Sequence, residues 1–324
     1  MQLSQSSGAN VEHSYTVNLA MVCMVVISVV GQEPTAVPSS PHGVTQNPPG
    51  ASGGVSAAQL ANANNPLADM NAFNFQNYYA PILYGSPDSN SNTLDLRPVV
   101  VSGRQIIRAT LPVSSVPIGN GRYQSGLGDF SIFDAIKLTG AGAKTDLAVG
   151  PLLVAPTATD HALGQGKWQA GIAGVAIHPL PGGSLLGTLA TWQHSFAGQS
   201  ERPDAQVVTF QPIGTFSIGG GYYFRTSAVW LFDIPNEKYL IPLGLGLGKV
   251  FKVQGAVVNA FIEPQFSAYH NGSGLPSVQL FMGLNLQFPK KPKAEKLAAM
   301  GYSGVDVVIP HPLAKPPEHA QTRE

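Results

Sequence analysis

Charge is scarce in this chain of 324 residues: only 11% of them are Asp, Glu, Lys or Arg, and the formal net charge is zero. A soluble globular domain carries roughly 25% charged residues. A nucleic-acid partner would need a basic face, and this balance argues against one. Sparse charge also gives a soluble protein little protection against self-association. The composition therefore points away from nucleic-acid binding and from an ordinary soluble domain.

Cysteine and long apolar runs are scarce too. The single cysteine, Cys23, lies in "LAMVCMVVISVV" (19–30), a run of about a dozen residues, whereas a membrane-spanning helix needs about 20. Such a run is typical of a secretory signal peptide, so residues 1–31 are predicted to be cut off after Gly31. The leader before the run has no Lys or Arg, which leaves a short anchor helix as the alternative. Once cut, the chain has no cysteine for disulfides, thiol catalysis or metal ligation.

The two ends of the remaining chain have compositions that disfavour packed structure. Residues 32–64 are rich in Pro, Gly, Ser and Asn and are predicted to be disordered. The stretch 57–76 could hold a short helix interrupted at Pro66, but a linker is the preferred interpretation. Residues 289–324 combine proline with charge and are predicted to form a polar, solvated tail, with contact to anionic lipid headgroups as the alternative.

Between these ends, apolar and aromatic runs recur and are separated by Gly, Pro, Asn and Asp. The runs are longer than the usual globular strand of about 5–6 residues and match the roughly 9–11 residues of a tilted strand that crosses a bilayer. About a dozen strands are predicted, at 76–84, 94–101, 104–113, 128–138, 145–155, 167–178, 184–197, 205–218, 221–233, 238–250, 255–269 and 277–288.

Side chains alternate between apolar and polar in several of these runs. In 255–269 the even positions are apolar, and the odd positions include Asn259, Glu263 and Gln265. Successive strand residues point to opposite faces of a sheet, so such a strand has one dry face and one wet face. The run 277–288 repeats the pattern. The earlier runs are less regular: 167–178 is ambiguous, and Asp134 shares a face with an isoleucine.

Both a soluble sandwich and a membrane barrel produce this alternation. The wet faces carry mainly Gly, Ser, Thr, Gln and Asn, where the outside of a sandwich should be rich in Lys and Glu. Aromatic residues near strand ends are typical of the interfacial girdles of barrels: Trp168, Tyr222, Tyr239, Tyr269 and Phe288. Residues 65–288 are therefore predicted to form an all-β, transmembrane antiparallel β-barrel of about 12 strands, with about 10–14 compatible with the pattern.

The segment "PLGLGLGK" (242–249) places three leucines on one face and three glycines on the other. Glycines that face inward would leave room for a side chain, a plug or a ligand. The last predicted strand ends at Phe288 with alternating apolar residues before it, which resembles the terminal signature by which outer-membrane barrels are recognised for assembly. The tail beyond Phe288 departs from that signature, which usually ends the chain.

The candidate functional residues are polar or charged side chains predicted to face the lumen. A charge in a lumen can set an ion preference, and a structural Arg–Glu pair that braces the barrel is the equally supported alternative. The candidate lumen-lining residues are Arg108, Asp134, Arg225, Asn259, Glu263 and Gln265. Charged residues in "TATDHALGQG" and "QSERPDAQ" are predicted to lie in loops, which either shape an entrance or are merely solvated.

Motifs for catalysis or cofactor binding are weak. "TGAGAKT" (139–145) lacks the glycine directly before the lysine that a phosphate-binding loop has. His194 and Ser195 are neighbours in a strand and point to opposite faces, so they cannot form a nucleophile–base pair. Ser195 or another serine with His270 leaves a lipid hydrolase as an alternative. The sequence also has no HExxH or similar spacing of metal ligands. No enzyme activity, metal or cofactor is therefore predicted.

Several phrases resemble a family of bacterial proteins often labelled neuromedin U, a label that looks like a misnomer. They are "SGLGDFSIFDA", "PTATDHALGQGKWQAG", "TWQHSFAGQSERPDAQVVTFQP", "GYYFRTSAVWLFD", "YLIPLGLGLGKVFKV", "NAFIEPQFSAYHNGSGLP" and "LFMGLNLQF". The group is similar to the wider outer-membrane family associated with phenol meta-pathway degradation, which is grouped with transporters. The resemblance implies a β-barrel in the outer membrane that passes small compounds, apolar or aromatic ones among them.

Taken together, these observations predict a channel or transporter for small molecules in the outer membrane of a Gram-negative bacterium, reached through the signal peptide. Its expected partners are outer-membrane lipids, the barrel-assembly machinery during biogenesis, and a small solute that the sequence does not identify. An outer-membrane lipid hydrolase and a non-conducting structural or adhesive barrel are the alternatives. A barrel of about 12 strands is wider than the side-chain-filled barrel of 8 and narrower than general porins of 16–18, so a narrow or partly plugged pore is expected.

Overall fold

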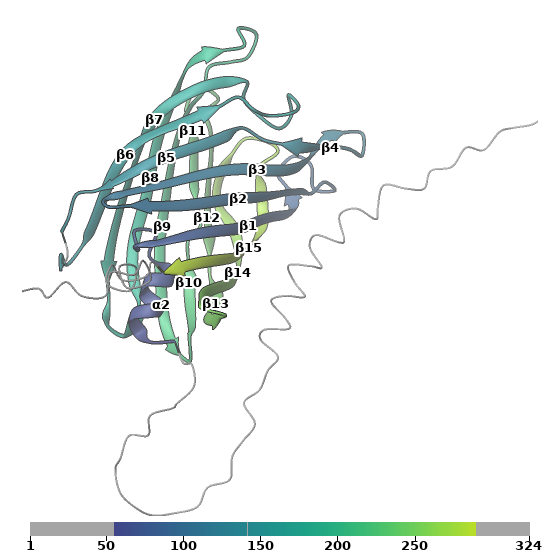
Figure 1. Cartoon of the computed structure of the whole chain (residues 1–324). Helices are drawn as coiled ribbons and strands as arrows, with labels where there is room; N and C mark the ends of the chain where they lie inside the picture. The colour runs from purple at the N-terminus through teal and green to yellow at the C-terminus, as the bar shows by residue number, and fades with distance from the viewer. Residues whose placement is uncertain (1–54, 141, 290–324) are drawn as a thin grey trace, which may run out of the picture. The chain divides into compact units, whose positions relative to one another are not determined.

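The structure is a computed structural model that describes residues 55–140 and 142–289 (Figure 1). The predicted signal peptide, most of the predicted disordered segment and nearly all of the predicted tail lie outside the described residues. The described chain begins with one helix, α2 (Ala57–Asn64), and continues as a single large sheet with one short 3-10 turn, η1 (Pro181–Gly183). No helix in this part of the chain is both long and apolar enough to cross a membrane.

The sheet contains fifteen strand segments that follow one another along the chain. They are β1 (Met70–Leu83), β2 (Ser91–Ser102), β3 (Gln105–Gly119), β4 (Arg122–Leu127), β5 (Phe130–Lys137), β6 (Asp146–Ala155), β7 (Lys167–Pro179), β8 (Leu185–Gly198), β9 (Gln206–Gly219), β10 (Tyr222–Thr226), β11 (Trp230–Asp233), β12 (Lys238–Gly244), β13 (Gly246–Val253), β14 (Ala256–Asn271) and β15 (Pro276–Pro289).

The sheet closes on itself because its first strand pairs with its last. Met70 at the start of β1 lies opposite Pro289 at the end of β15, and every pairing in the ring is antiparallel. Three of the barrel strands are each split into two segments: β4 and β5 both pair with β3, β10 and β11 with β9, and β12 and β13 with β14. The ring therefore has twelve barrel strands, and the predicted all-β antiparallel barrel is confirmed.

All of the predicted strands are present, with boundaries shifted by a few residues. The largest shifts are at the start of β1 (Met70 rather than 76), at the end of β3 (Gly119 rather than 113) and at the start of β4 (Arg122 rather than 128). The sequence pattern did not reveal the three interruptions, at 128–129, 227–229 and Leu245. At 227–229 and Leu245 the predicted strand runs across the interruption, because hydrophobic periodicity alone cannot show that the hydrogen-bond ladder is broken there. At 128–129 the predicted strand began at the interruption, so β4 (Arg122–Leu127) was missed.

The helix α2 differs from the disordered segment predicted for residues 32–64. Ser56 caps it through a reciprocal pair of bonds: Gln59 N donates to Ser56 Oγ at 3.2 Å, and Ser56 N donates to Gln59 Oε1 at 3.1 Å. This capping box satisfies two backbone donors at the helix start. Leu60 and Ala63 are buried, so α2 is held by contacts with the barrel that the composition of residues 32–64 does not reveal.

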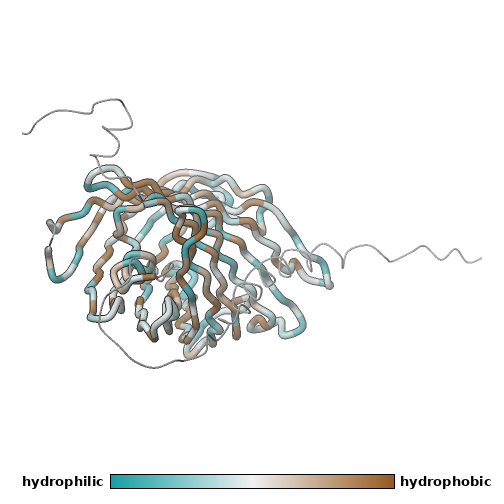
Figure 2. The backbone as a smooth tube through the Cα atoms, turned by 60° about the horizontal axis from the view of Figure 1, so that its bottom comes forward, coloured by the Kyte–Doolittle hydropathy of each residue, from teal (hydrophilic) through white to brown (hydrophobic). Residues whose placement is uncertain are grey.

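The outer surface of the barrel is apolar. Ile172 on β7, Trp192 on β8 and Leu245 beside β13 are 50%, 44% and 67% exposed, and residues of this kind recur on most strands. Hydrophilic and hydrophobic positions alternate along the strands (Figure 2). On β14, by contrast, Asn259, Glu263 and Gln265 are at most 1% exposed. The apolar side of these strands therefore faces outward and the polar side faces the interior.

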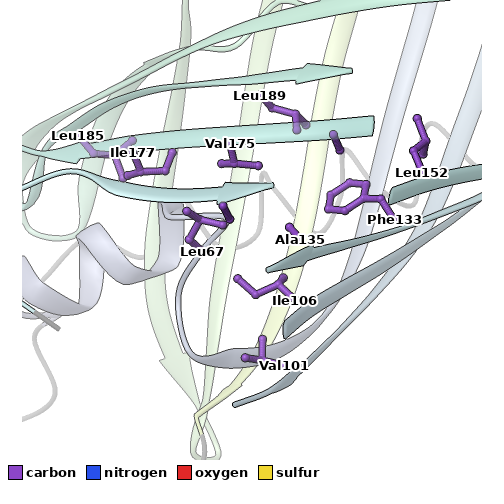
Figure 3. Close-up of a cluster of buried hydrophobic side chains, with 12 residues drawn as sticks. Leu67, Val101, Ile106, Phe133, Ala135, Leu152, Val175, Ile177, Leu185 and Leu189 are labelled. Atoms are coloured by element: carbon purple, nitrogen blue, oxygen red, sulfur yellow. The ribbon is translucent and has the colours of Figure 1, made fainter. Parts of the chain in front are cut away.

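The interior is not polar all the way round, and the apolar part comes from the earlier strands, where the alternation was less regular. The inward residues of β6, β7 and β8 include Leu152, Val175 and Leu189, which pack with Leu67 and with residues of β2, β3 and β5 in one buried apolar cluster. Figure 3 shows Leu67, which follows α2, among these barrel residues. The run 167–178 was ambiguous because both faces of β7 are apolar: one faces outward and the other packs inside the barrel.

Candidate functional site

A cavity of ≈ 160 Å³ lies inside the barrel, between the chain that follows α2 and the inward side chains of the wall. Residues 63–68 and Met70 form one side of it. The remaining lining comes from strands far apart in the sequence, from β1 to β15, because the closed ring brings them round a common interior. The charged residues that line the cavity are three arginines: Arg97, Arg108 and Arg225.

Arg225 belongs to a buried network that is centred on Glu263. Arg225 Nε donates to Glu263 Oε2 at 2.8 Å, and the carboxylate also accepts bonds from Ser227 N, Ser227 Oγ and Gln265 Nε2 at 2.8–2.9 Å. The guanidinium lies 3.4 Å from the ring centre of Phe261. A carboxylate that is 0% exposed is stabilised by such a set of donors together with a paired charge. For Arg225 and Glu263, this geometry favours a structural Arg–Glu pair that braces the barrel over charges that set an ion preference.

This network also satisfies the backbone at a break in the wall. The strand stops at Thr226, and the N–H of Ser227 is bonded by Glu263 instead of by a neighbouring strand. The carbonyl of Ser227 accepts a bond from Gln211 Nε2 at 2.8 Å. Backbone polar groups away from water need partners, so inward side chains replace the missing ladder bonds here.

Arg97 is also neutralised within the wall. It forms an ion pair with Asp95 on the same inward face of β2, with Nη2 and Oδ2 separated by 2.6 Å, and it donates a second bond to Gln76 of β1. Neither Arg97 nor Asp95 was among the predicted lumen residues. A signal for them was present: the two residues stand two apart in the predicted strand 94–101 and so share a face.

Arg108 differs from the other two arginines. Among the described residues its guanidinium has no hydrogen bond or ion pair. Its Nε is buried without a partner, as is that of Arg97, but Arg97 has its other bonds. Arg108 contacts its register partner on β5, Phe133, whose ring centre lies 4.4 Å from the guanidinium carbon. The cavity therefore contains one guanidinium whose charge the wall does not neutralise.

Asn259 joins the cavity wall to the segment after α2. Its side chain accepts a bond from Tyr223 Oη at 2.5 Å and donates to the carbonyl of Ala63 at 3.0 Å. Gln287 of β15 donates to the same carbonyl at 2.8 Å. Leu60 and Ala63 pack beside Tyr223 in a second apolar cluster. The helix is thus fastened inside the end of the barrel at which β1 begins and β15 ends, as Figure 1 shows.

Of the six predicted lumen residues, Arg108, Arg225 and Asn259 line the cavity, and Glu263 and Gln265 lie buried in the network beside it. Asp134 does not join them. Phe133 and Ala135 on either side of it line the cavity, so strand alternation turns Asp134 to the outer face. There its Oδ2 accepts a bond from Gln105 at 2.8 Å, close to the β2–β3 turn. Because apolar and polar residues do not alternate regularly in 128–138, the sequence did not show that Asp134 points outward.

The glycines of "PLGLGLGK" leave the space that the sequence suggested. A Cβ added to Gly248 would lie 2.2 Å from the ring of Tyr223, and one added to Gly244 would lie 2.6 Å from Glu263 Oε1. The room that these glycines leave is therefore filled by neighbouring side chains of the barrel interior, including two that belong to the hydrogen-bond networks described above.

Two loops at the other end of the barrel are joined by Arg202. Its Nε donates to the carbonyl of Gln165 at 3.1 Å and its Nη2 to the carbonyl of His161 at 3.1 Å. The carboxylate of Asp129 accepts bonds from the backbone of Ala158 and of Gln165. The loop 156–166 is therefore an ordered structure, fastened to the β4–β5 break and to the loop after β8.

The geometry does not assemble a hydrolase site from the residues considered for one. Ser195 is buried, its Oγ donates to Asp204 at 3.3 Å, and its hydrogen-bond partners in the structure include no histidine. The ring of His270 stacks on that of Tyr84 with 3.3 Å between the ring centres. Within the described residues there is also no cluster of three or more His, Cys, Asp or Glu that could hold a metal ion.

No protein-family model matches this sequence, and no curated protein matches it either. Among solved structures, the chain is similar to an outer membrane channel from Pseudomonas putida F1, with a TM-score of 0.50, 13% sequence identity, and coverage of 68% of this chain and 94% of that one. It also matches the KdgM porin in complex with disordered oligogalacturonate, with a TM-score of 0.38, 7% identity, and coverage of 68% and 99%. At this level of identity, the likeness to the P. putida protein shows a shared fold.

Proposed function

We propose that this protein is a channel that lets small solutes pass through the interior of a barrel embedded in the outer membrane. The observation that carries the proposal is the pairing of an apolar outer surface with an interior cavity whose charged lining is three arginines. Apolar residues that recur on the outside of most strands are costly in water and are what a lipid-facing barrel needs. A cofactor has no role in such passage, since the lining itself selects the solute.

Aromatic side chains near the strand ends support the membrane location. Four exposed aromatic residues lie at the two ends of the barrel. Trp168, Tyr239 and Tyr269 are at the end that carries the loop 156–166, and Phe288 is at the α2 end. Outer-membrane barrels carry such residues in girdles at the two interfaces. Lipids of the outer membrane would surround the apolar band between them.

The route to that membrane is also a proposal. Export by the signal peptide and insertion by the barrel-assembly machinery agree with the terminal strand β15, which carries Phe288 next to its last residue and closes the ring against β1. Membership of the outer-membrane family often labelled neuromedin U, related to the phenol meta-pathway family, fits the fold shared with the P. putida channel. Apolar and aromatic solutes are the class that this family suggests.

The second candidate is a barrel that does not conduct. It is favoured by the apolar cluster around Leu67 and by the fastening of Ala63 to Asn259 and Gln287, which fill part of the interior. A plug that stays in place would leave the barrel with a structural role only.

Planar-bilayer recording with the purified full chain separates the two candidates. A channel should give discrete openings with conductance below that of general porins, because the cavity is small and the helix occupies one end. Absence of openings across several salts and voltages, from protein shown to be folded, would contradict the channel. Ester hydrolysis by the same preparation, abolished by Ser195→Ala, would support the hydrolase instead.

A further inference from the structure

The charges inside the barrel do not balance at one point. The ion pairs of Arg97 with Asp95 and of Arg225 with Glu263 neutralise two of the three arginines that line the cavity. Neither carboxylate is part of the lining itself. Arg108 is left with a positive charge and with an Nε that is buried without a partner. A guanidinium is charged at every physiological pH and offers five donors, so the cavity presents an unfilled anion-binding group.

The surroundings of Arg108 are apolar on the side toward the α2 end. Phe133 lies beneath the guanidinium, and Ile106 stands two residues along the same inward face of β3. Val175 and Leu189 line the same cavity from β7 and β8, and Leu67 covers it from the segment after α2. Figure 3 shows these apolar side chains gathered within the barrel. The anion-binding group thus stands at the edge of an apolar chamber.

The size of the chamber limits what it can hold. The whole cavity, with its polar part included, has a volume of ≈ 160 Å³, close to the roughly 150 Å³ apolar cavity that, in another protein, binds a single benzene molecule. One six-membered ring with a small polar group fits this volume, whereas a disaccharide or a long acyl chain exceeds it.

We propose that this cavity binds a small monocarboxylate with one apolar ring, the carboxylate held by Arg108 and the ring packed against Phe133, Ile106 and Val175. A carboxylate accepts two parallel bonds from a guanidinium, and one negative charge cancels the one uncompensated positive charge. A neutral ring compound would leave the charge of Arg108 unpaired, and a dianion would carry a second charge beside the apolar side chains. The inference rests on the proposed channel, because it names the solute class of that channel's interior.

Binding of benzoate to the folded full chain in detergent, measured by calorimetry, tests the site, with benzamide as its neutral counterpart. Saturable binding of benzoate, at least about tenfold tighter than benzamide, is expected. Arg108→Gln should weaken benzoate binding about 10- to 100-fold, the range for hydrogen bonds to a charged group, and should leave benzamide unchanged. Arg108→Lys keeps the positive charge but loses the planar guanidinium, so its affinity for benzoate should lie between those of the wild type and Arg108→Gln.

The matched control is Arg122→Gln, which removes the same charge from an exposed position at the start of β4, outside the cavity lining. It should bind benzoate as the wild type does. Equal benzoate binding by wild type and Arg108→Gln, or no saturable binding by the wild type, would overturn the site. A conducting protein that fails to bind benzoate refutes the site and leaves the channel intact. A protein that binds benzoate but never conducts supports the site and refutes the channel.

Discussion

Single residues in this barrel are distinguished by the partners they find across the interior. Glu263 and Arg225 stand 38 positions apart in the chain and make an ion pair at 2.8 Å. Arg108 faces the same cavity and has no such partner among the described residues. Two arginines with similar sequence surroundings therefore have different roles: one braces the wall and the other is available to a ligand.

The brace gives a prediction about stability. Glu263→Gln keeps the size of the side chain but leaves Arg225 without its counter-charge in a buried site, which should cost about 3–5 kcal/mol in the free energy of unfolding. Urea titration of the folded fraction in detergent measures the loss. Replacing both residues, Arg225→Gln with Glu263→Gln, should recover part of it because no unpaired charge remains.

The control for this prediction is Glu201→Gln, an exposed carboxylate on the turn after β8. It removes the same charge and should change the free energy of unfolding by less than about 0.5 kcal/mol. A Glu263→Gln barrel that unfolds at the wild-type urea concentration would show that Glu263 contributes no net bracing.

At the scale of elements, the helix α2 and the residues after it do the most to shape the interior. They form one side of the cavity, contribute Leu67 to the apolar cluster, and bond to β14 and β15 through the carbonyl of Ala63. The broken strands are the second such feature, because inward side chains satisfy the backbone at Ser227. Both features belong to parts of the chain where the hydrophobic pattern is weak or misleading.

Removal of the helix should widen the conducting path. A chain that lacks residues 55–66 loses α2 and part of one side of the cavity, so its single-channel conductance should rise severalfold over that of the full chain. A deletion of equal length at 38–49, upstream of the described residues, is the matched control and should conduct as the full chain does. Equal conductance of the 55–66 deletion and the full chain would show that α2 does not restrict the path.

The whole molecule is a ring of twelve strands with an uneven interior. The inner faces of β14 and β15 are largely polar, whereas those of β6, β7 and β8 carry apolar residues. The outside is apolar on most strands. This arrangement separates the protein from a soluble sandwich, in which the apolar faces of two sheets would pack against each other.

A closed barrel in a membrane should resist detergent until it is heated. The chain in outer-membrane fractions should stay in the pellet after carbonate extraction and should migrate faster in an unheated gel sample than in a boiled one. The first strand pairs with the last, so the sheet presents no open edge to detergent. A chain without residues 276–289 loses the strand that closes the ring and should show a single migration. Release of the full chain by carbonate would rule out an integral barrel.

The sequence by itself determined the strands, their approximate ends and, for the later ones, the side that faces inward. That information is local: an alternation of period two within 255–269 already assigns Asn259 and Glu263 to one face. It failed for Asp134, because the strand that carries it has apolar residues on both faces, and for α2, because a linker-like composition masks a helix that is stabilised by distant contacts.

Only the tertiary structure decided which inward residues meet. Asn259 bonds to Ala63, 196 positions earlier in the chain, and the fold brings Glu263 to Arg225 on a different strand. Asp95 pairs with Arg97 within β2, and Arg108 has no such partner among the described residues. Pairings between strands depend on the number of strands and the register of the ring, which no local pattern encodes. The sequence thus predicts most of the polar side chains that enter the interior, and the tertiary structure decides which of them pair with one another.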